Sequence, residues 1–242
     1  MFDHVTIRVD DRAASERFYD TVLRPLGIER TYRTELFSEW QNFMVTGADE
    51  ATPVTRRLHV AFAAPSQEQV DEFWQVGTEA GHADDGQPGP RPEYRDDYYG
   101  AFLRDPDGNS AEAVNHGAMR RAGAIDHLWI RVADVAAAKR FYETIAPYAG
   151  LRLGDDTPDR VQFVGAGGSF SLVHGTPTEN LHMAFPSDDD DDIQRFHEAA
   201  IDAGYASNGP PDERPRYHPG YYAAYVLDPD GNNIEVVNHH RP

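Results

Sequence analysis

Two histidines and one glutamate recur in the same order in each half of the sequence. The first half has His4, His59 and Glu112, and the second half repeats the set 123 residues later as His127, His182 and Glu235. Imidazole and carboxylate groups are ligands for divalent metals such as Fe, Mn, Ni or Zn. Each glutamate stands in a strand pattern, where this residue type is uncommon and needs a partner if buried. We therefore predict that at least one set binds a divalent metal. The alternative is a metal-free pocket in which the same groups bind a ligand by hydrogen bonds.

The step of 123 residues extends far beyond these six positions. It also relates Phe18-Tyr19 to Phe141-Tyr142 and Tyr94 to Tyr217, and it aligns "DPDGN" with "DPDGN" ahead of each glutamate. A constant step over so many positions indicates two copies of one unit. We expect copies at residues 1–118 and 125–242, joined by a linker at residues 119–124.

Each copy divides again into two modules. The opening histidines of the modules are 55 residues apart in both copies, each within a short strand pattern. Helical spacing of apolar residues follows each of these strands, and Gly27 and Gly150 mark helix ends. Further strands complete each module. The order β-α-β-β(-β) is therefore expected four times.

Strand alternation separates the side chains of each opening strand onto two faces. In "FDHVTIRV" the apolar residues Val5, Ile7 and Val9 share one face, and His4 and Arg8 lie on the other. The apolar face can pack on the helix. A sheet curled with the polar face inward would bring the histidines and the glutamate together.

The amino-acid composition excludes several kinds of partner and site for this protein. The formal charge of −19 argues against nucleic acid or an anionic membrane as a partner, because both need clustered Lys and Arg. The absence of cysteine excludes disulfides and thiolate ligands. No apolar run has the ~18 residues of a membrane span, and the first residues enter a strand pattern directly. We expect a cytoplasmic protein without a signal peptide.

These motifs together resemble the vicinal oxygen chelate superfamily, which includes glyoxalase I, fosfomycin-resistance thiol transferases, type I extradiol dioxygenases and bleomycin-resistance proteins. The resemblance rests on "DHVTIRV…FY…LG", "LHVAF" and "DPDGN…E" and covers both copies. It implies an α+β fold of tandem βαβββ modules, four in all, forming two cup-shaped curled sheets with helices on the outside. It also implies that the six repeated histidines and glutamates are the metal ligands.

Departures from the family pattern bear on the chemistry. Glyoxalase I typically adds a glutamate as a fourth ligand, and no glutamate stands in the corresponding strands here. His218 and Tyr225 fit part of the extradiol dioxygenase fingerprint, in the second copy only, and we predict them as catalytic residues. Predicted substrate-binding residues on the polar faces of the opening strands are Arg8, Trp129 and Arg131. Those predicted at the mouths of the cups, where they could equally form a rim over the sheet edge, are Tyr94, Tyr98, Tyr99, Tyr217, Tyr221 and Tyr222.

We interpret the chain as a metal-dependent enzyme that binds a small oxygenated substrate through two oxygens, like a glyoxalase or an extradiol dioxygenase. The alternative is a metal-free binding protein of the bleomycin-resistance type. Two pairings of modules are open. Each copy can close on itself, or the copies can exchange modules, so that His4 joins His182 and Glu235. We favour exchange, which gives a fused dimer that is a monomer or a homodimer.

Overall fold

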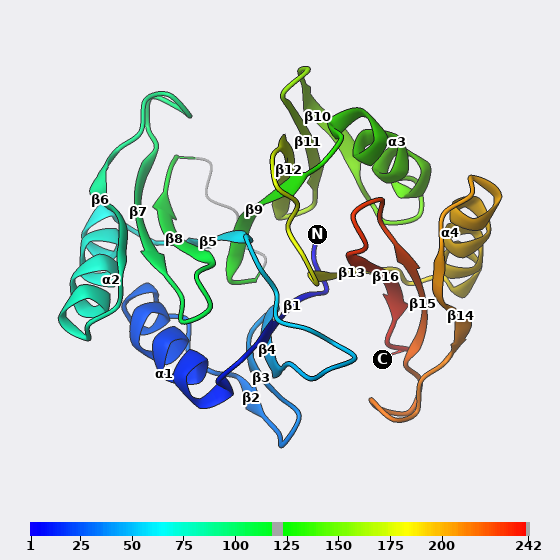
Figure 1. Cartoon of the computed structure of the whole chain (residues 1–242), viewed down its shortest axis with the longest axis horizontal. Helices are drawn as coiled ribbons and strands as arrows, with labels where there is room; N and C mark the ends of the chain where they lie inside the picture. The colour runs from blue at the N-terminus through cyan, green and yellow to red at the C-terminus, as the bar shows by residue number, and fades with distance from the viewer. Residues whose placement is uncertain (118–122, 241–242) are drawn as a thin grey trace.

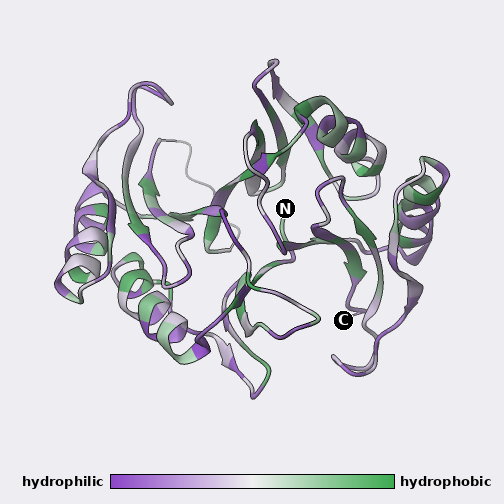
Figure 2. Cartoon of the chain, in the orientation of Figure 1, coloured by the Kyte–Doolittle hydropathy of each residue, from purple (hydrophilic) through white to green (hydrophobic). Residues whose placement is uncertain are grey.

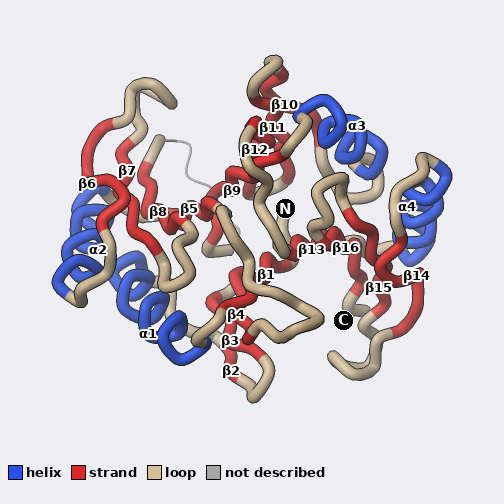
Figure 3. Tube along the Cα trace, viewed as in Figure 1, coloured by secondary structure: helices blue, strands red, loops and turns tan. Residues whose placement is uncertain are grey.

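The computed structural model describes residues 1–117 and 123–240, and residues 119–122 of the predicted linker fall outside these ranges. Four helices and sixteen strands are present in the described part of the chain. Figure 3 shows the strands running through the middle of the molecule and the helices at its periphery. The predicted α+β architecture of four tandem modules and two curled sheets is confirmed.

Each module opens with one strand, continues with a helix and ends with three strands. The first copy contains β1 (His4–Val9), α1 (Arg12–Leu23), β2 (Tyr32–Arg33), β3 (Phe37–Trp40), β4 (Phe43–Gly47), β5 (His59–Ala63), α2 (Gln67–Glu79), β6 (Asp84–Pro90), β7 (Tyr99–Arg104) and β8 (Ser110–Asn115). The second contains β9 (Ile125–Val132), α3 (Val135–Ile145), β10 (Arg152–Asp156), β11 (Arg160–Gly165), β12 (Gly168–His174), β13 (His182–Pro186), α4 (Asp190–Asp202), β14 (Ser207–Glu213), β15 (Tyr222–Leu227) and β16 (Asn233–Asn238). A short 3-10 helix, η1 (Arg24–Leu26), follows α1.

A polar residue caps the start of each of the four helices. Asp11, Ser66, Asp134 and Asp189 each accept a hydrogen bond from a backbone N–H in the first turn, which satisfies a donor that has no partner inside the helix. The acidic residues after Asp189 occupy the first turn of α4, where negative charge favours the helix dipole. No helix in the described residues is long and apolar enough to cross a membrane.

Each of the two eight-stranded sheets takes one module from each copy. The first has the order β14-β15-β16-β13-β1-β4-β3-β2, and the second has the order β10-β11-β12-β9-β5-β8-β7-β6. The copies meet where β1 pairs with β13 and where β5 pairs with β9, both antiparallel. In Figure 1, α1 and α2 lie on one side of the molecule and α3 and α4 on the other. The exchanged pairing of modules is therefore confirmed.

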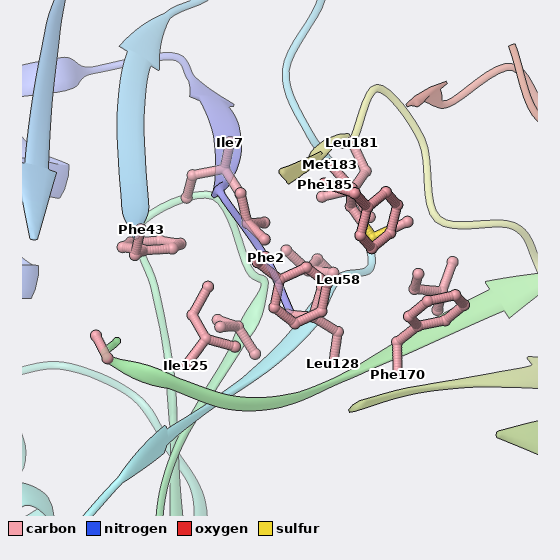
Figure 4. Close-up of a cluster of buried hydrophobic side chains, with 14 of the residues drawn as sticks. Phe2, Ile7, Phe43, Leu58, Ile125, Leu128, Phe170, Leu181, Met183 and Phe185 are labelled. Carbon is pink, nitrogen blue, oxygen red and sulfur yellow. The ribbon is translucent and has the colours of Figure 1, made fainter. Parts of the chain in front are cut away.

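The main core fills the space where the four opening strands approach one another. Figure 4 shows aromatic and aliphatic side chains from both copies meeting there, among them Phe2, Leu128, Phe170 and Phe185. The helices have one buried apolar face and one polar face, seen as alternating green and purple in Figure 2. Burial of the apolar faces of the sheets leaves the histidine-bearing faces free to line the cups.

The same hydrogen bonds in both copies fix the turn before β8, which carries Glu112, and before β16, which carries Glu235. Asp105 accepts hydrogen bonds from the backbone N–H groups of Asp107 and Asn109, and Asp228 does the same for its turn. The Tyr19 hydroxyl donates to Asp105 at 3.0 Å. The repeated "FY" and "DPDGN" motifs therefore lock the strands that carry the glutamates against the helices.

Candidate metal centres

Three strands converge on each predicted ligand set. In the first sheet β13 lies between β1 and β16, and Ala184 is opposite His4 on one side and opposite Glu235 on the other. In the second sheet Ala61 of β5 lies between His127 and Glu112 in the same way. A small residue between the two ligands leaves room for their side chains to meet over the strand.

The first set, which we name the Glu235 site, consists of His4, His182 and Glu235. The Nε2 atoms of the two histidines are 3.0 Å apart. Oε2 of Glu235 lies 2.9 Å from Nε2 of His182 and 3.7 Å from Nε2 of His4. The glutamate is 1% exposed, so three potential ligand atoms face one another away from bulk water.

The second set, which we name the Glu112 site, consists of His59, Glu112 and His127. Oε2 of Glu112 lies 2.8 Å from Nε2 of His59 and 3.6 Å from Nε2 of His127. In both sites the ligand atoms lie within 4.8 Å of one another. Convergence is predicted for at least one set, and both sets converge in their exchanged composition. Two imidazoles with one carboxylate fit a divalent transition metal. Metal binding itself remains a prediction.

A buried tyrosine holds the other oxygen of each glutamate. The Tyr98 hydroxyl donates to Oε1 of Glu112 at 2.6 Å, and the Tyr221 hydroxyl donates to Oε1 of Glu235 at 2.5 Å. These bonds leave Oε2 directed at the histidines. Burial and the adjacent carboxylate raise the pKa of both tyrosines, so both hydroxyls stay protonated and keep donating.

The electrostatics of the Glu235 site favour an ionised carboxylate. Burial opposes ionisation of Glu235, but hydrogen bonding and charge from His182, together with His4 and Tyr221, hold its pKa below the usual range. Burial lowers the pKa of His182, which favours the neutral imidazole that a metal ligand must be. His4 differs, because Asp3 and Glu235 raise its pKa against the effect of burial.

Each triad also has partners on the far nitrogens of its histidines. Nδ1 of His4 is 2.8 Å from Asp3, and Nδ1 of His127 is 3.0 Å from Asp126. Nδ1 of His59 is 3.2 Å from the Ser110 hydroxyl. These partners were not among the predicted site residues. The repeated dipeptide Asp-His is the signal in the sequence that could have indicated the two aspartates.

A cavity of about 280 Å³ opens directly onto the Glu112 site. The three triad residues line it together with predicted substrate-binding residues Tyr94, Tyr98, Trp129 and Arg131, and with Phe102 and Arg104, which were not predicted. Tyr94 and Trp129 meet edge to face with ring centroids 5.6 Å apart. The cavity therefore has an aromatic wall, two arginines and a candidate metal site.

A cavity of about 490 Å³ borders the Glu235 site, and its lining includes Tyr217 and Tyr225 but not the triad itself. Tyr225 pairs with Glu235 across neighbouring strands, and its buried hydroxyl has no hydrogen bond of good geometry to the described residues. Burial and Glu235 raise the pKa of Tyr225. Arg8 lies close enough to Tyr217 and His182 to interact with both through its charge.

Two of the predicted residues occupy places other than those expected. The Tyr99 hydroxyl donates to Asp71 of α2, and the Tyr222 hydroxyl accepts from Gln194 of α4, so both tyrosines face the helices. Their assignment to the mouths of the cups was wrong, because alternation turns the neighbouring Tyr98 and Tyr221 inward instead. His218, which the sequence predicts as a catalytic residue, lies 2.8 Å from His239, and its role stays a prediction.

The modules that begin with His4 and His127 have no glutamate at the strand position where the other two modules carry their ligand glutamate. Glu112 lies opposite Ala61, two residues beyond the ligand His59. The corresponding partner in the module of His4 is Met44, opposite Thr6, and in the module of His127 it is Ser171, opposite Trp129. Each site therefore has three ligands from the repeated sets. His174, the histidine nearest to the position of a fourth ligand in the sequence, is an exposed residue at the end of β12.

The fold and the doubled His-His-Glu triads define a protein of tandem modules with two repeated sites, and comparison identifies its family. The model described as Glyoxalase/Bleomycin resistance protein/Dioxygenase superfamily matches residues 1–113 and 124–236, so the chain belongs to this superfamily. The comparison with curated proteins gives no match.

Three solved structures illustrate the similarity. Glyoxalase I from Zea mays is 18% identical, with a TM-score of 0.72 over 98% of this chain and 92% of that protein. A Bacillus subtilis protein provisionally designated a dioxygenase is 14% identical, with a TM-score of 0.66 over 99% of this chain and 85% of that one. A glyoxalase/bleomycin resistance protein from Albidiferax ferrireducens is 34% identical over 47% of this chain and 98% of that one, with a TM-score of 0.42. At these identities the two full-length similarities concern the fold.

Proposed function

We propose that this protein is a metal-dependent enzyme that binds a small oxygenated substrate beside a divalent ion held by two histidines and one glutamate. The observation that carries the proposal is the convergence of Nε2, Nε2 and Oε2 within 4.8 Å in two independent sites. A single histidine on a strand is weak evidence for a metal. Two sets of three ligands, each with a buried glutamate that a tyrosine hydroxyl fixes, are much harder to explain without one.

The donor set fits the proposed ion. His59, Glu112 and His127 would hold it in one site, and His4, His182 and Glu235 in the other. When bound, a divalent ion supplies Lewis acid chemistry toward two neighbouring oxygens of a substrate. Three protein ligands leave coordination positions for those oxygens, as is typical of catalytic rather than structural metal sites.

The residues around the Glu112 site would bind and enclose the substrate. Arg104 and Arg131 supply positive charge, and Trp129 and Tyr94 supply an apolar wall that excludes water. Arg104 is paired with Asp85 at 2.5 Å, so Arg131 is the better candidate for an anionic group. A cavity of about 280 Å³ favours a small molecule.

The Glu235 site carries the candidate for proton transfer. Tyr225 presents a buried hydroxyl beside Glu235, where the Glu112 site has Phe102 at the repeated position. Because its pKa is raised, Tyr225 would donate a proton or a hydrogen bond rather than act as a base. His218, joined to His239, would supply protons from the surface side of this site.

Metal analysis of protein purified without chelators tests the proposal. We expect close to two ions per chain, and one in each of Glu112→Gln and Glu235→Gln. The two variants should lose different ions, so the double variant should bind none. A wild-type protein that neither retains nor takes up Mn(II), Fe(II), Ni(II) or Zn(II) would overturn it. That result would support the metal-free binding protein, whose cavity would hold a flat ligand against Trp129.

A further inference from the structure

We propose that Asp3 and Asp126 are positioning residues that hold the ligand histidines His4 and His127 with Nε2 directed at the metal. The inference rests on the proposed metal sites and extends them to residues outside the ligand sets. Each aspartate stands directly before its histidine, and the two pairs occupy the same position in the two copies. The distances from carboxylate oxygen to Nδ1 are 2.8 Å and 3.0 Å.

Neighbouring residues in a regular strand point to opposite faces, so an aspartate next to a histidine does not normally reach its ring. The register of β9 against β5 explains how Asp126 does so. Ala61 is opposite His127 while Phe62 is opposite Ile125, which leaves Asp126 as an extra residue in the ladder. Such a bulge redirects a side chain, and here it brings the carboxylate beside the ring of His127.

The first copy has the same arrangement at the start of β1. Ala184 is opposite His4, and its carbonyl also accepts the backbone N–H of Asp3 at 2.9 Å. Two consecutive residues therefore share one partner, and Asp3 folds back toward the ring of His4. In both copies the aspartate therefore lies beside the ring of the histidine that follows it.

A second histidine fixes each carboxylate from the other side. His239 lies 2.9 Å from Asp3, and His116 lies 3.2 Å from Asp126. An aspartate is ordinarily ionised at neutral pH, so each carboxylate can only accept hydrogen bonds from the two rings.

An acceptor at Nδ1 determines the tautomer of the ligand ring. Nδ1 of His4 and of His127 must carry a proton to bond the carboxylate, and a neutral ring then has its lone pair on Nε2. Nε2 is the atom that faces the triad in both sites. A carboxylate partner also makes the ligand nitrogen more basic, which strengthens its bond to a cation.

The two sites provide an internal control for the test. Metal-free wild type, Asp3→Ala and Asp126→Ala would be titrated with Zn(II) against a chromophoric chelator. Asp126→Ala should weaken one of the two binding steps by about 10–100-fold and leave the other unchanged. Asp3→Ala should weaken the other step. Placing each change in a Glu235→Gln or Glu112→Gln background assigns the steps to the sites.

Asp126→Asn separates orientation from charge, because its side-chain oxygen can still accept from Nδ1. We expect an affinity between those of wild type and Asp126→Ala. Nitrogen-15 NMR of the His127 ring in the metal-free protein supplies a second readout, with a protonated Nδ1 in wild type and a mixture of tautomers in Asp126→Ala.

The inference is overturned if both aspartate variants bind two Zn(II) ions with wild-type affinity. It is also overturned if both binding steps weaken together in proportion to a loss of thermal stability, since that result indicates a structural role only. If Asp126→Ala does not fold, the Asp126→Asn titration decides. A wild-type protein that binds no Zn(II) overturns the proposed metal sites themselves, an outcome distinct from unchanged binding in the variants.

Discussion

Replacing Tyr98 by phenylalanine removes one hydroxyl and keeps the ring, so it tests the bond that orients Glu112. The bond is 2.6 Å long, its acceptor is a carboxylate, and Glu112 is 1% exposed, so water cannot easily replace the lost donor. Hydrogen bonds to charged groups contribute about 1.5–3 kcal/mol, and burial places this bond in the upper half of that range. We expect the free energy of unfolding to fall by about 2–3 kcal/mol.

Thermal unfolding of metal-free protein measures this change. A loss of 1 kcal/mol lowers the melting temperature by roughly 2–4 °C in a chain of this size, so Tyr98→Phe should melt roughly 4–12 °C below wild type. Tyr99→Phe is the matched control, because its hydroxyl bonds the exposed Asp71. Surface changes of that kind are usually within about 0.5 kcal/mol.

The same substitution should weaken Zn(II) binding at the Glu112 site by about 10-fold, because Oε2 of Glu112 would no longer be held toward the histidines. The Glu235 site should be unaffected, since Tyr221 serves it separately. Equal melting temperatures for Tyr98→Phe and Tyr99→Phe, with unchanged metal affinity, would refute the reasoning.

Three other outcomes are expected. Removal of metal by a chelator should lower the melting temperature of wild type, since an ion at 100 times its dissociation constant stabilises the folded state by about 2.7 kcal/mol; identical curves with and without chelator would contradict this. Burial opposes ionisation of Glu16, but Ser38, Arg33 and Arg12 hold its pKa below 4.5, so its contribution is present above that pH and is lost as the pH falls below it. Urea unfolding should therefore separate Glu16→Gln from wild type more at pH 7 than at pH 3, and an equal gap at both would count against the assignment. With a net charge of −19, the protein should melt at a higher temperature in 1 M potassium chloride than at low salt, and a flat salt dependence would rule out a role for charge repulsion.

Much of the site could be predicted from strand alternation and the repeat alone. His4 and Arg8 face one way and Val5 and Ile7 the other, as expected, because a six-residue strand such as β1 follows the two-residue period closely. The constant step of 123 residues then showed that Glu112 and Glu235 occupy equivalent positions in the two copies. The alternation rule says which face a residue takes, and it therefore found the ligands.

The remaining features depend on departures from regular alternation or on pairing between distant strands. Asp126 reaches His127 through a bulge, which no pattern in one strand indicates. Tyr98 and Tyr99 are adjacent and identical in type, so the sequence does not show which one turns toward the glutamate. The choice between exchanged and self-closed copies depends on whether β1 pairs with β13 or β5, and both partners begin with the same apolar pattern around a histidine.

The exchanged pairing limits which changes the duplicated chain can tolerate during evolution. Each triad draws its ligands from both copies, with one histidine from one copy and a histidine and a glutamate from the other. A duplicated domain that closes on itself can lose its twin and keep a working centre, whereas here deletion of either half would dismantle both centres at once. Point changes are a different matter, since loss of His4 harms one centre and leaves the other intact. The two centres can therefore diverge separately under natural selection. A chain shortened to one copy would keep a complete triad only if two such chains formed a dimer.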